Sequence, residues 1–171
     1  MLMSRFRIRI LARLLTRFPG LFDKSVEKVA AFKVEGAPWT PFTKPLNKSR
    51  VAIVTTAGVH LVTQEPFKMK DPDGDPSFRE LPSATPMKDY MITHDYYDHS
   101  DADRDLNIVF PIERLRELEE TGVIGGVADM NYGFMGHIDG PHIETLIKKT
   151  APEVAGRVKR NGVDAVVLTP G

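Results

Sequence analysis

Arg50-Val51-Ala52-Ile53-Val54-Thr55-Thr56-Ala57-Gly58 is the stretch that decides the fold of this chain. Its centre, residues 51–54, is continuously apolar, which is the pattern of a parallel strand buried on both faces. Polar residues follow at the carboxyl end, where open α/β sheets bind their ligands. The stretch therefore predicts a central strand that ends at a binding site.

A second buried strand closes the sequence. Val163-Asp164-Ala165-Val166-Val167-Leu168-Thr169-Pro170-Gly171 is rich in β-branched and aliphatic residues and ends in a Pro-Gly turn signal. We expect this strand to point at the same site.

The segment between these two strands begins with a long excursion. Residues 64–88 contain five prolines and several acids and predict a functional loop. We predict a further strand from Tyr90 to Thr93. Pro111 then suits the first turn of a helix over residues 112–121.

Two Gly-rich stretches and further helices follow. Residues 123–129 hold a possible short strand, and residues 132–137 read as a Gly/aromatic loop. Pro141 opens a helix, and Thr150 is expected to cap another that runs to Arg160. This order is typical of an α/β protein with a Rossmann-like open sheet, mostly parallel, with an N-terminal basic helix and a long Pro/Asp-rich excursion.

The composition is that of an ordinary globular domain. The chain has 171 residues, of which 42% are hydrophobic and 27% charged. It has no cysteine, which excludes disulfides, thiolate metal sites and a cysteine nucleophile within these residues. We predict no membrane span, because no apolar stretch approaches roughly 18 residues.

The formal net charge of zero conceals an asymmetry. Residues 1–50 hold eleven Lys or Arg against three acids, and residues 71–105 hold ten acids against three basic residues. Such a separation can hold two parts of a fold together or steer a charged partner. The positive charge is not interleaved with stacking aromatics, so we predict no nucleic-acid partner.

The N-terminal segment is basic and amphipathic. Residues 1–18 contain five arginines, no acid and a helical apolar stripe that Pro19-Gly20 ends. They predict a helix that packs on the domain or a partner, with a transit peptide or a membrane-surface helix as alternatives. A second short helix from Phe22 to about Phe32 and a Pro-rich arm follow, so we divide the chain into residues 1–49 and an α/β domain over 50–171.

His94-Asp95-Tyr96-Tyr97-Asp98-His99 is the densest cluster of ionisable side chains. His94, Asp98 and His99 match the zinc motif of metallo-β-lactamase-like hydrolases, but Tyr96 replaces one histidine ligand. A metal-dependent hydrolase is therefore an alternative function. Asp71 to Asp75 lacks the spacing of a calcium loop and reads as an acidic turn.

Two further groups could bind a ligand. Residues 100–105 place one guanidinium among several carboxylates, either as a local ion-pair network or to orient His94 or His99. Thr55 to Gly58 could hold an anion with backbone N–H groups, although the glycine pattern and lysine of nucleotide-binding loops are absent.

Taken together and in order, several motifs resemble the selenoprotein B family of glycine, sarcosine, betaine and D-proline reductases. The resemblance covers about residues 38–171 and rests on these segments: Val51–Leu61, Gly74–Arg79, Thr93–Asp98, Ser100–Asp105 with Asn107, Val109–Leu115 and Tyr132–Gly136.

The resemblance implies a nucleophile just beyond this chain. In the family, the strand ending Val-Val-Leu-Thr-Pro-Gly is followed by selenocysteine, or by cysteine in selenium-independent relatives. We expect that the chain ends at Gly171 because a UGA codon was read as a stop, which makes the reductase domain incomplete. The chain alone would then be inactive.

The resemblance also implies the chemistry, which is reductive cleavage of the C–N bond alpha to a carboxylate. A selenol is ionised at neutral pH, as a reactive thiolate must be. The implied partners are a reductase subunit that carries a pyruvoyl group and a thiol or thioredoxin-type reductant. A homo-oligomer and a cytoplasmic location are further expectations, and a non-catalytic binding subunit is the other alternative.

Roles for individual residues follow from their expected places at strand ends. His94, Asp95 and Asp98 would support catalysis, and no residue is expected to bind a metal. The expected substrate-binding residues are Thr55, Thr56, His60, Asp103, Arg104, Tyr132, Thr169 and Gly171.

Overall fold

The computed structural model describes residues 5–17 and 40–170. They belong to two compact units, one made of residues 1–43 and 95–98 and the other of residues 44–94 and 99–171. The predicted second helix, from Phe22 to about Phe32, lies outside the described residues.

The first unit contains the basic helix. Helix α1, Arg5–Arg17, confirms the predicted N-terminal helix. Ile10, Leu11 and Leu14 are exposed, whereas Ala12 is buried. Within the same unit, Arg13 Nε lies 3.8 Å from Asp98 Oδ1.

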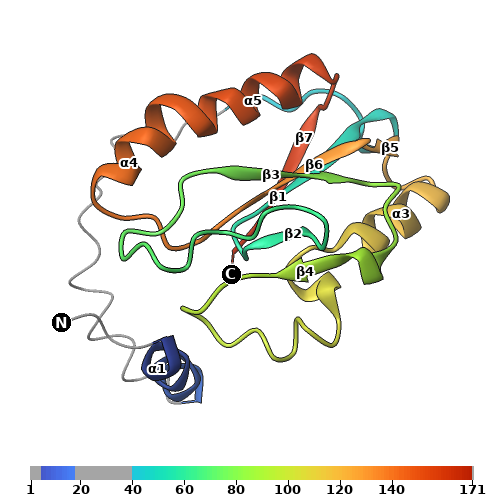
Figure 1. The fold of residues 1–171 in the computed structure, drawn as a ribbon. Coiled ribbons are helices and arrows are strands. Elements are labelled where there is room, and N and C mark those ends of the chain that lie inside the picture. The colour runs from blue at the N-terminus through green and yellow to red at the C-terminus, as the bar shows by residue number, and fades with distance from the viewer. Residues whose placement is uncertain (1–4, 18–39, 171) are drawn as a thin grey trace. The chain divides into compact units, whose positions relative to one another are not determined.

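The second unit is built on a mixed sheet around β1, Arg50–Thr55 (Figure 1). Strand β7, Ala165–Thr169, runs parallel to β1 from Val51 to Thr55. Strands β5, Gly126–Val127, and β6, Met130–Phe134, pair parallel with the beginning and the end of β1. Because β7 pairs along the whole of one edge of β1, β5 and β6 share the other edge of β1.

The apolar run after Arg50 forms this central strand, as predicted. Val51, Ala52 and Ile53 are buried, which fits a strand with neighbours on both edges and both faces. The α/β class is therefore confirmed, and the sheet itself is mixed, because one further strand is antiparallel.

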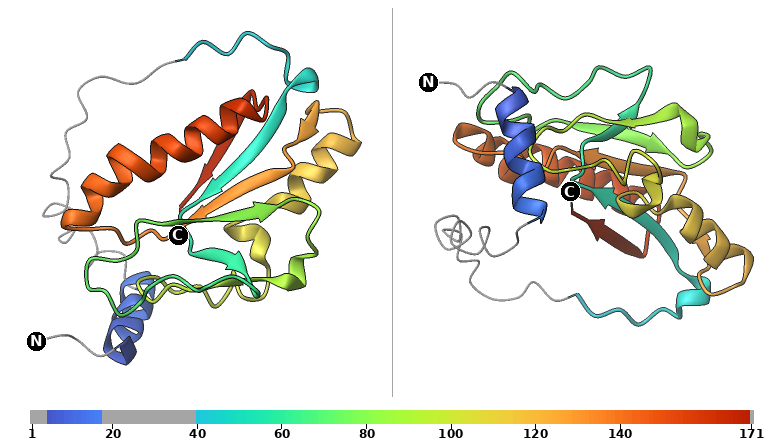
Figure 2. Two further views of the ribbon diagram at one scale, coloured as in Figure 1. Left: turned by 45° about the horizontal axis from the view of Figure 1, so that its top comes forward. Right: turned by 90° about the horizontal axis from the view of Figure 1, so that it is seen from below.

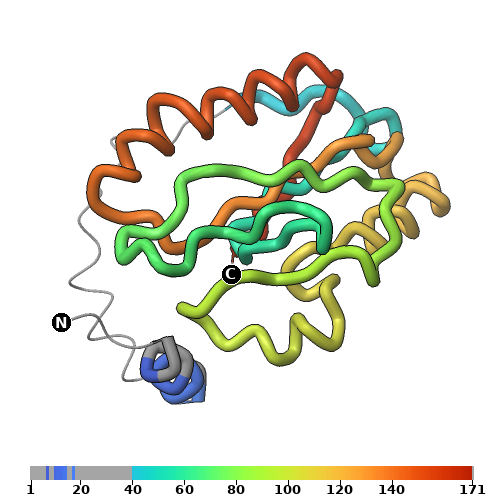
Figure 3. Tube along the Cα trace, in the orientation of Figure 1, coloured from blue at the N-terminus to red at the C-terminus, as the bar shows by residue number. Residues whose placement is uncertain are grey.

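That strand comes from the excursion, where the sequence predicted only a loop. Strand β3, Phe78–Pro82, pairs antiparallel with β6, with Phe78 opposite Phe134 and Pro82 opposite Met130. The prediction was wrong because surrounding prolines obscure this short run. Pro82 is tolerated because it ends the strand. Figure 3 traces the path from β2 through residues 62–77 into β3.

Strand β6 also corrects a prediction, because its residues were expected to form a Gly/aromatic loop. Gly133 lies inside the strand, and a Cβ there would lie 2.3 Å from the carbonyl oxygen of Val59. The glycine therefore allows β6 and the chain at Val59 to approach closely. The aromatic neighbours Tyr132 and Phe134 are buried in the core.

A small antiparallel sheet completes the strands. Strand β2, Val59–Leu61, pairs with β4, Tyr90–Ile92, and not with the main sheet. The predicted strand at Tyr90 thus forms, but outside the parallel core. Its partner β2 was not predicted.

Helices lie on opposite sides of the main sheet (Figures 1 and 2). Helix α3, Ile112–Glu120, follows Pro111 as predicted and buries Ile112 and Leu115. On the other side, Val154 packs with Tyr132 and Phe134 in one core cluster.

The second helical layer is continuous from Pro141 to Arg160. It comprises α4, Pro141–Thr145, a π-helical turn, Leu146–Thr150, and α5, Ala151–Arg160. Thr150 has helical backbone angles and makes no capping hydrogen bond, so the predicted cap was wrong. Pro152 cannot donate a backbone hydrogen bond, and the widened turn before it accommodates that loss.

Candidate functional site

The carboxyl ends of β1 and β7 meet. Thr55 lies opposite Thr169 in the parallel register, and the next backbone N–H, that of Thr56, donates to Thr169 O at 2.9 Å. The Thr55 hydroxyl accepts from Ala57 N at 3.2 Å, which fixes the turn after β1. The sequence predicted this meeting because parallel strands end at one edge of a sheet.

Thr169 also anchors the end of β7 to another part of the unit. Its hydroxyl donates to the carbonyl oxygen of Val109 at 2.6 Å. Val109 directly follows the short 3₁₀ helix Leu106–Ile108. This bond therefore joins the β7 end to the segment that this 3₁₀ helix begins.

His60 is fully buried on β2 and makes two hydrogen bonds. Its Nδ1 lies 2.7 Å from Leu61 O, and its Nε2 lies 2.8 Å from the Thr93 hydroxyl. A carbonyl oxygen can only accept, so Nδ1 carries the hydrogen and neutral Nε2 accepts the hydroxyl proton of Thr93. Burial lowers the pKa of His60, against the Leu61 hydrogen bond and with the help of Arg79.

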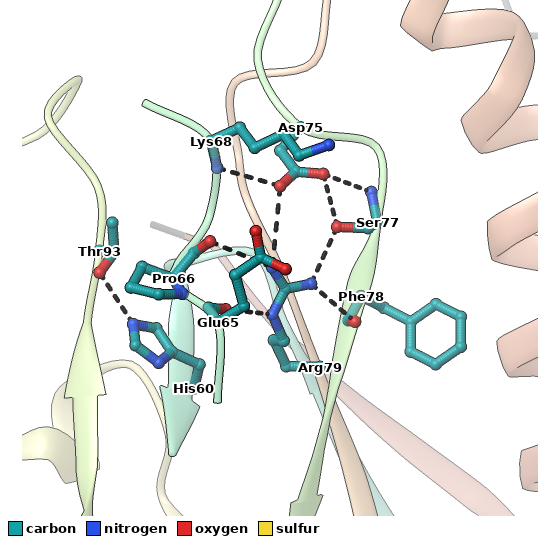
Figure 4. A network of polar contacts seen from close by, with 9 residues as sticks. All are labelled: His60, Glu65, Pro66, Lys68, Asp75, Ser77, Phe78, Arg79 and Thr93. Carbon is teal, nitrogen blue, oxygen red and sulfur yellow. Dashed lines mark hydrogen bonds and ion pairs between the residues drawn. The ribbon is translucent and has the colours of Figure 1, made fainter. Parts of the chain in front are cut away.

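A second, partly buried network lies beside His60 (Figure 4). Arg79 donates to Glu65 O, Ser77 Oγ and Phe78 O at 2.8, 2.9 and 3.0 Å. Its guanidinium also stacks on Phe67, with the carbon 4.4 Å from the ring centroid. With its donors engaged in this way, Arg79 holds the excursion in place.

Asp75 is the acid of this network. It accepts from Lys68 N at 3.0 Å, Ser77 N at 2.9 Å and Ser77 Oγ at 2.5 Å. Burial alone would raise the pKa of Asp75, but the hydrogen bonds from Ser77 and Lys68 outweigh it and hold the pKa below its usual value.

A cleft of about 520 Å³ opens between the β4 segment and residues 102–107. It contains the predicted residues Asp103 and Arg104. Its charged lining has both signs and comprises Lys88, Asp103, Arg104, Asp105 and Glu113. Its size suits a small polar ligand.

Hydrogen bonds stiffen the wall of this cleft. Asn107 donates to Asp105 at 3.0 Å and to Glu113 at 2.8 Å. The side-chain hydrogen bond from Asn107 holds the pKa of Asp105 below its usual value, and its backbone N–H acts in the same direction. Arg104 pairs with Asp101 at 3.1 Å at the exposed rim.

The predicted histidine cluster is divided between the two units. His94 belongs to the larger unit, and Asp95 and Asp98 belong to the smaller one. His94 and Asp95 are buried, and His99 Nδ1 lies 2.9 Å from Asp103 Oδ2. The supporting role of His94, Asp95 and Asp98 stays a prediction.

The remaining predicted residues lie elsewhere. The Tyr132 ring packs edge-on against Phe78 in the core, with centroids 5.8 Å apart. Burial raises the pKa of Tyr132, with Glu80 acting in the same direction. Gly171 lies outside the described residues.

Two negative observations apply to residues 5–17 and 40–170. They contain no group of three His, Cys, Asp or Glu side chains that could hold a metal ion. None of their helices is long and apolar enough to cross a membrane.

Comparison with known proteins identifies the family of this chain. The model of the family described as glycine/sarcosine/betaine reductase selenoprotein B matches residues 28–171. The chain belongs to this family. The selenoprotein B assignment agrees with the motifs after β1 and around His94, and the family name implies selenocysteine in its full-length members.

Several curated relatives are subunits of reductase complexes. D-proline reductase subunit gamma of Acetoanaerobium sticklandii is 42% identical over 133 residues, which cover 78% of this chain and 53% of the relative. Glycine reductase complex component B subunit gamma of Symbiobacterium thermophilum is 31% identical over 145 residues, which cover 77% and 30%. Betaine reductase complex component B subunit beta of Peptoclostridium acidaminophilum is 29% identical over 139 residues, which cover 74% and 29%.

The chain thus spans about half of the D-proline reductase subunit and less than a third of the other two. No solved structure matches it.

Sequence reasoning missed Thr93 as the partner of His60 and the partly buried network of Asp75 and Arg79. The pairs within it that are close in sequence, such as Asp75 with Ser77, could have been found from the spacing of an Asx-type turn. The pairing of His60 with Thr93 depends on strands β2 and β4, which the sequence did not place together.

Proposed function

We propose that this chain is part of a reductase that cleaves the C–N bond alpha to the carboxylate of a small amino acid or betaine. The observation that supports this most strongly is the family match over residues 28–171. The β1 and β7 ends, which meet at Thr55 and Thr169, are the proposed place of the reaction. The 50–171 domain boundary and a cytoplasmic location are part of the same proposal.

The nucleophile in this proposal is a selenocysteine or cysteine that follows Gly171. The chemistry it supplies is displacement of the amine from the α-carbon, with a dithiol or thioredoxin-type protein as reductant. The residues of this chain hold the strand that presents it. The hydrogen bond from Thr56 N to Thr169 O joins the ends of β1 and β7. The hydrogen bond from the Thr169 hydroxyl to Val109 O fixes the direction in which the chain leaves the sheet.

The cleft between the β4 segment and residues 102–107 is the proposed substrate site. An amino acid or betaine carries a carboxylate and a cationic nitrogen, and the cleft offers groups of both signs. Lys88 and Arg104 suit the carboxylate, and Asp103 and Asp105 suit the cationic nitrogen. A subunit with a pyruvoyl group would activate the amine from the partner side.

The test is a chimera in which residues 28–171 replace the matched part of D-proline reductase subunit gamma. Assembled with its natural partner subunits, the chimera should reduce at least one of D-proline, glycine, sarcosine and betaine, with a dithiol as reductant. Substrate loss and amine release are measured by mass spectrometry. A folded, assembled chimera that acts on none of the four would contradict the proposal.

Arg104→Ala tests the substrate site in the same chimera. Loss of a charge-assisted hydrogen bond should raise KM about tenfold or more, with a smaller change in kcat. Arg160→Ala removes an exposed guanidinium from the end of α5 and is the matched control. Equal KM values for the two variants would exclude Arg104 from the site.

A further inference from the structure

Strand β7 has the side chains of an internal strand but lies at an edge. Among the strands the structure describes, it pairs only with β1. Its residues from Ala165 to Leu168 are apolar on both faces, and Val166, Val167 and Leu168 are 38%, 36% and 75% exposed. Exposed edge strands normally carry a lysine, a proline or a bulge, and β7 has none between its ends. This pattern indicates a strand that has neighbours on both sides.

An apolar groove accompanies this edge. A hollow of about 430 Å³ lies between α5 and β7. Val154, Ala155 and Val158 of α5 form one wall, and Val166 and Leu168 of β7 form the other. Figures 1 and 2 show that α5 and β7, which supply these two walls, are neighbouring elements.

The handedness of the fold predicts what fits there. The chain leaves β6, passes through α4 and α5, and enters β7 parallel to β1. Crossovers of this kind are almost always right-handed. A further parallel strand beyond β7, reached in the same direction, would therefore place its helix on the α5 side. The helix of such a unit would therefore lie in the groove between α5 and β7.

The relatives contain enough chain to provide such a unit. D-proline reductase subunit gamma has about as many residues outside the match as inside it, since the match covers 53% of its length. We propose that the outer edge of β7 and the α5 groove hold a further helix–strand unit from that other half of the reductase polypeptide. The strand pairs parallel with β7, and the apolar face of the helix covers Val166 and Leu168.

The proposal is tested by the accessibility of a single thiol. The chain has no cysteine, so Leu168→Cys introduces one thiol whose labelling by a maleimide can be followed by peptide mass spectrometry. In the chain alone this thiol should react freely. In the chimera with the other half of D-proline reductase subunit gamma, it should react at least about tenfold more slowly, because the helix covers it.

Val62→Cys is the matched control. Val62 is 52% exposed and follows β2, which pairs with β4 and not with β7, so its thiol should label equally fast in both proteins. Equal rates for Leu168→Cys in the chain and the chimera would overturn the proposal. Slow labelling of Leu168→Cys in the chain alone, with a dimer seen by light scattering, would also overturn it, because a second copy would then be the occupant.

A stability comparison gives an independent readout. Leu168→Glu should change Tm by less than about 2 °C in the chain alone, because the side chain is exposed. In the chimera it should lower Tm by about 5 °C or more, because a carboxylate would be buried against the helix. Equal shifts in the two proteins would contradict the proposal. Neither readout requires catalysis, so the proposed function and this interface fail or succeed separately.

Discussion

At the scale of single residues, Asn131 replaces backbone pairing in the middle of the main sheet. Strands β5 and β6 leave a gap along β1, and there Ile53 N donates to Asn131 Oδ1 at 2.8 Å. The amide nitrogen of Asn131 donates to Ser83 Oγ at 2.8 Å and to Leu81 O at 3.3 Å. The side chain is fully buried, so all of these groups depend on it.

Asn131→Leu should therefore lower the free energy of unfolding by about 2–4 kcal/mol, because the buried Ile53 N–H and Leu81 carbonyl lose a partner. Urea denaturation of the chain measures this change. Asn161→Leu alters an exposed asparagine after α5 and should change the free energy by less than about 0.5 kcal/mol. Similar changes in the free energy of unfolding for the two variants would show that other groups satisfy the hydrogen bonds of Ile53 N and Leu81 O.

Asp75 should make the stability of the chain depend on pH. The pKa of Asp75 is below its usual value in the folded state, so its contribution is present above the unfolded pKa of about 3.9. That contribution is lost as the pH falls from there toward the folded pKa. Asp75→Asn should lower the free energy of unfolding by about 1–3 kcal/mol at pH 7 and reduce the loss of stability in acid.

Urea denaturation at several pH values between 7 and 3 checks this prediction. Asp101→Asn removes an exposed carboxylate from the cleft loop and is the control, because it should leave the acid dependence close to that of the parent. If Asp75→Asn and the parent lost stability in parallel, the carboxylate of Asp75 would not be responsible.

At the scale of elements, β6 depends on a close backbone approach. A Cβ on Gly133 would lie 2.3 Å from Val59 O, and a backbone atom cannot move aside as the end of a flexible side chain can. Gly133→Ala should cost about 2 kcal/mol or more and should disturb the pairing of β6 with β1 and β3. Thermal unfolding measures the cost.

Gly156→Ala is the control for this substitution. Gly156 lies within α5, and a Cβ there would lie 3.2 Å from Nη1 at the flexible end of the Arg160 side chain. Alanine favours the helix there, so this variant should be as stable as the parent or more stable by up to about 1 kcal/mol. Destabilisation by both variants alike would mean that the approach at Val59 is not the cause.

At the scale of the whole molecule, the two edges of the main sheet in the larger unit differ. On one side of β1, strand β6 is extended by the antiparallel strand β3, and β2 and β4 form a separate small sheet. On the other side, β7 has only β1 as a described partner. The catalytic proposal and the interface proposal both concern β7, the first at its carboxyl end and the second along its outer edge. Both proposals therefore assign the rest of the reductase polypeptide to the surroundings of β7.

The sequence by itself determined the elements whose signals are local. The apolar run after Arg50 and the run ending at Thr169 each form a strand, because continuous β-branched and aliphatic residues favour buried parallel strands wherever they pack. Pro111 and Pro141 mark the starts of helices, because proline suits the first turn. The order of motifs along residues 38–171 also determined the family.

Only the tertiary structure decided which distant groups meet. Strand β3 forms because it pairs with β6. Gly133 has the local sequence signal of a loop residue, and only its close approach to Val59 explains its place in a strand. His60 is held by Thr93, and Ile53 by Asn131, across gaps of 33 and 78 residues. A hydrogen bond of this kind forms only where packing and register bring two strands together. Local sequence patterns do not specify how close two residues far apart in the sequence will lie.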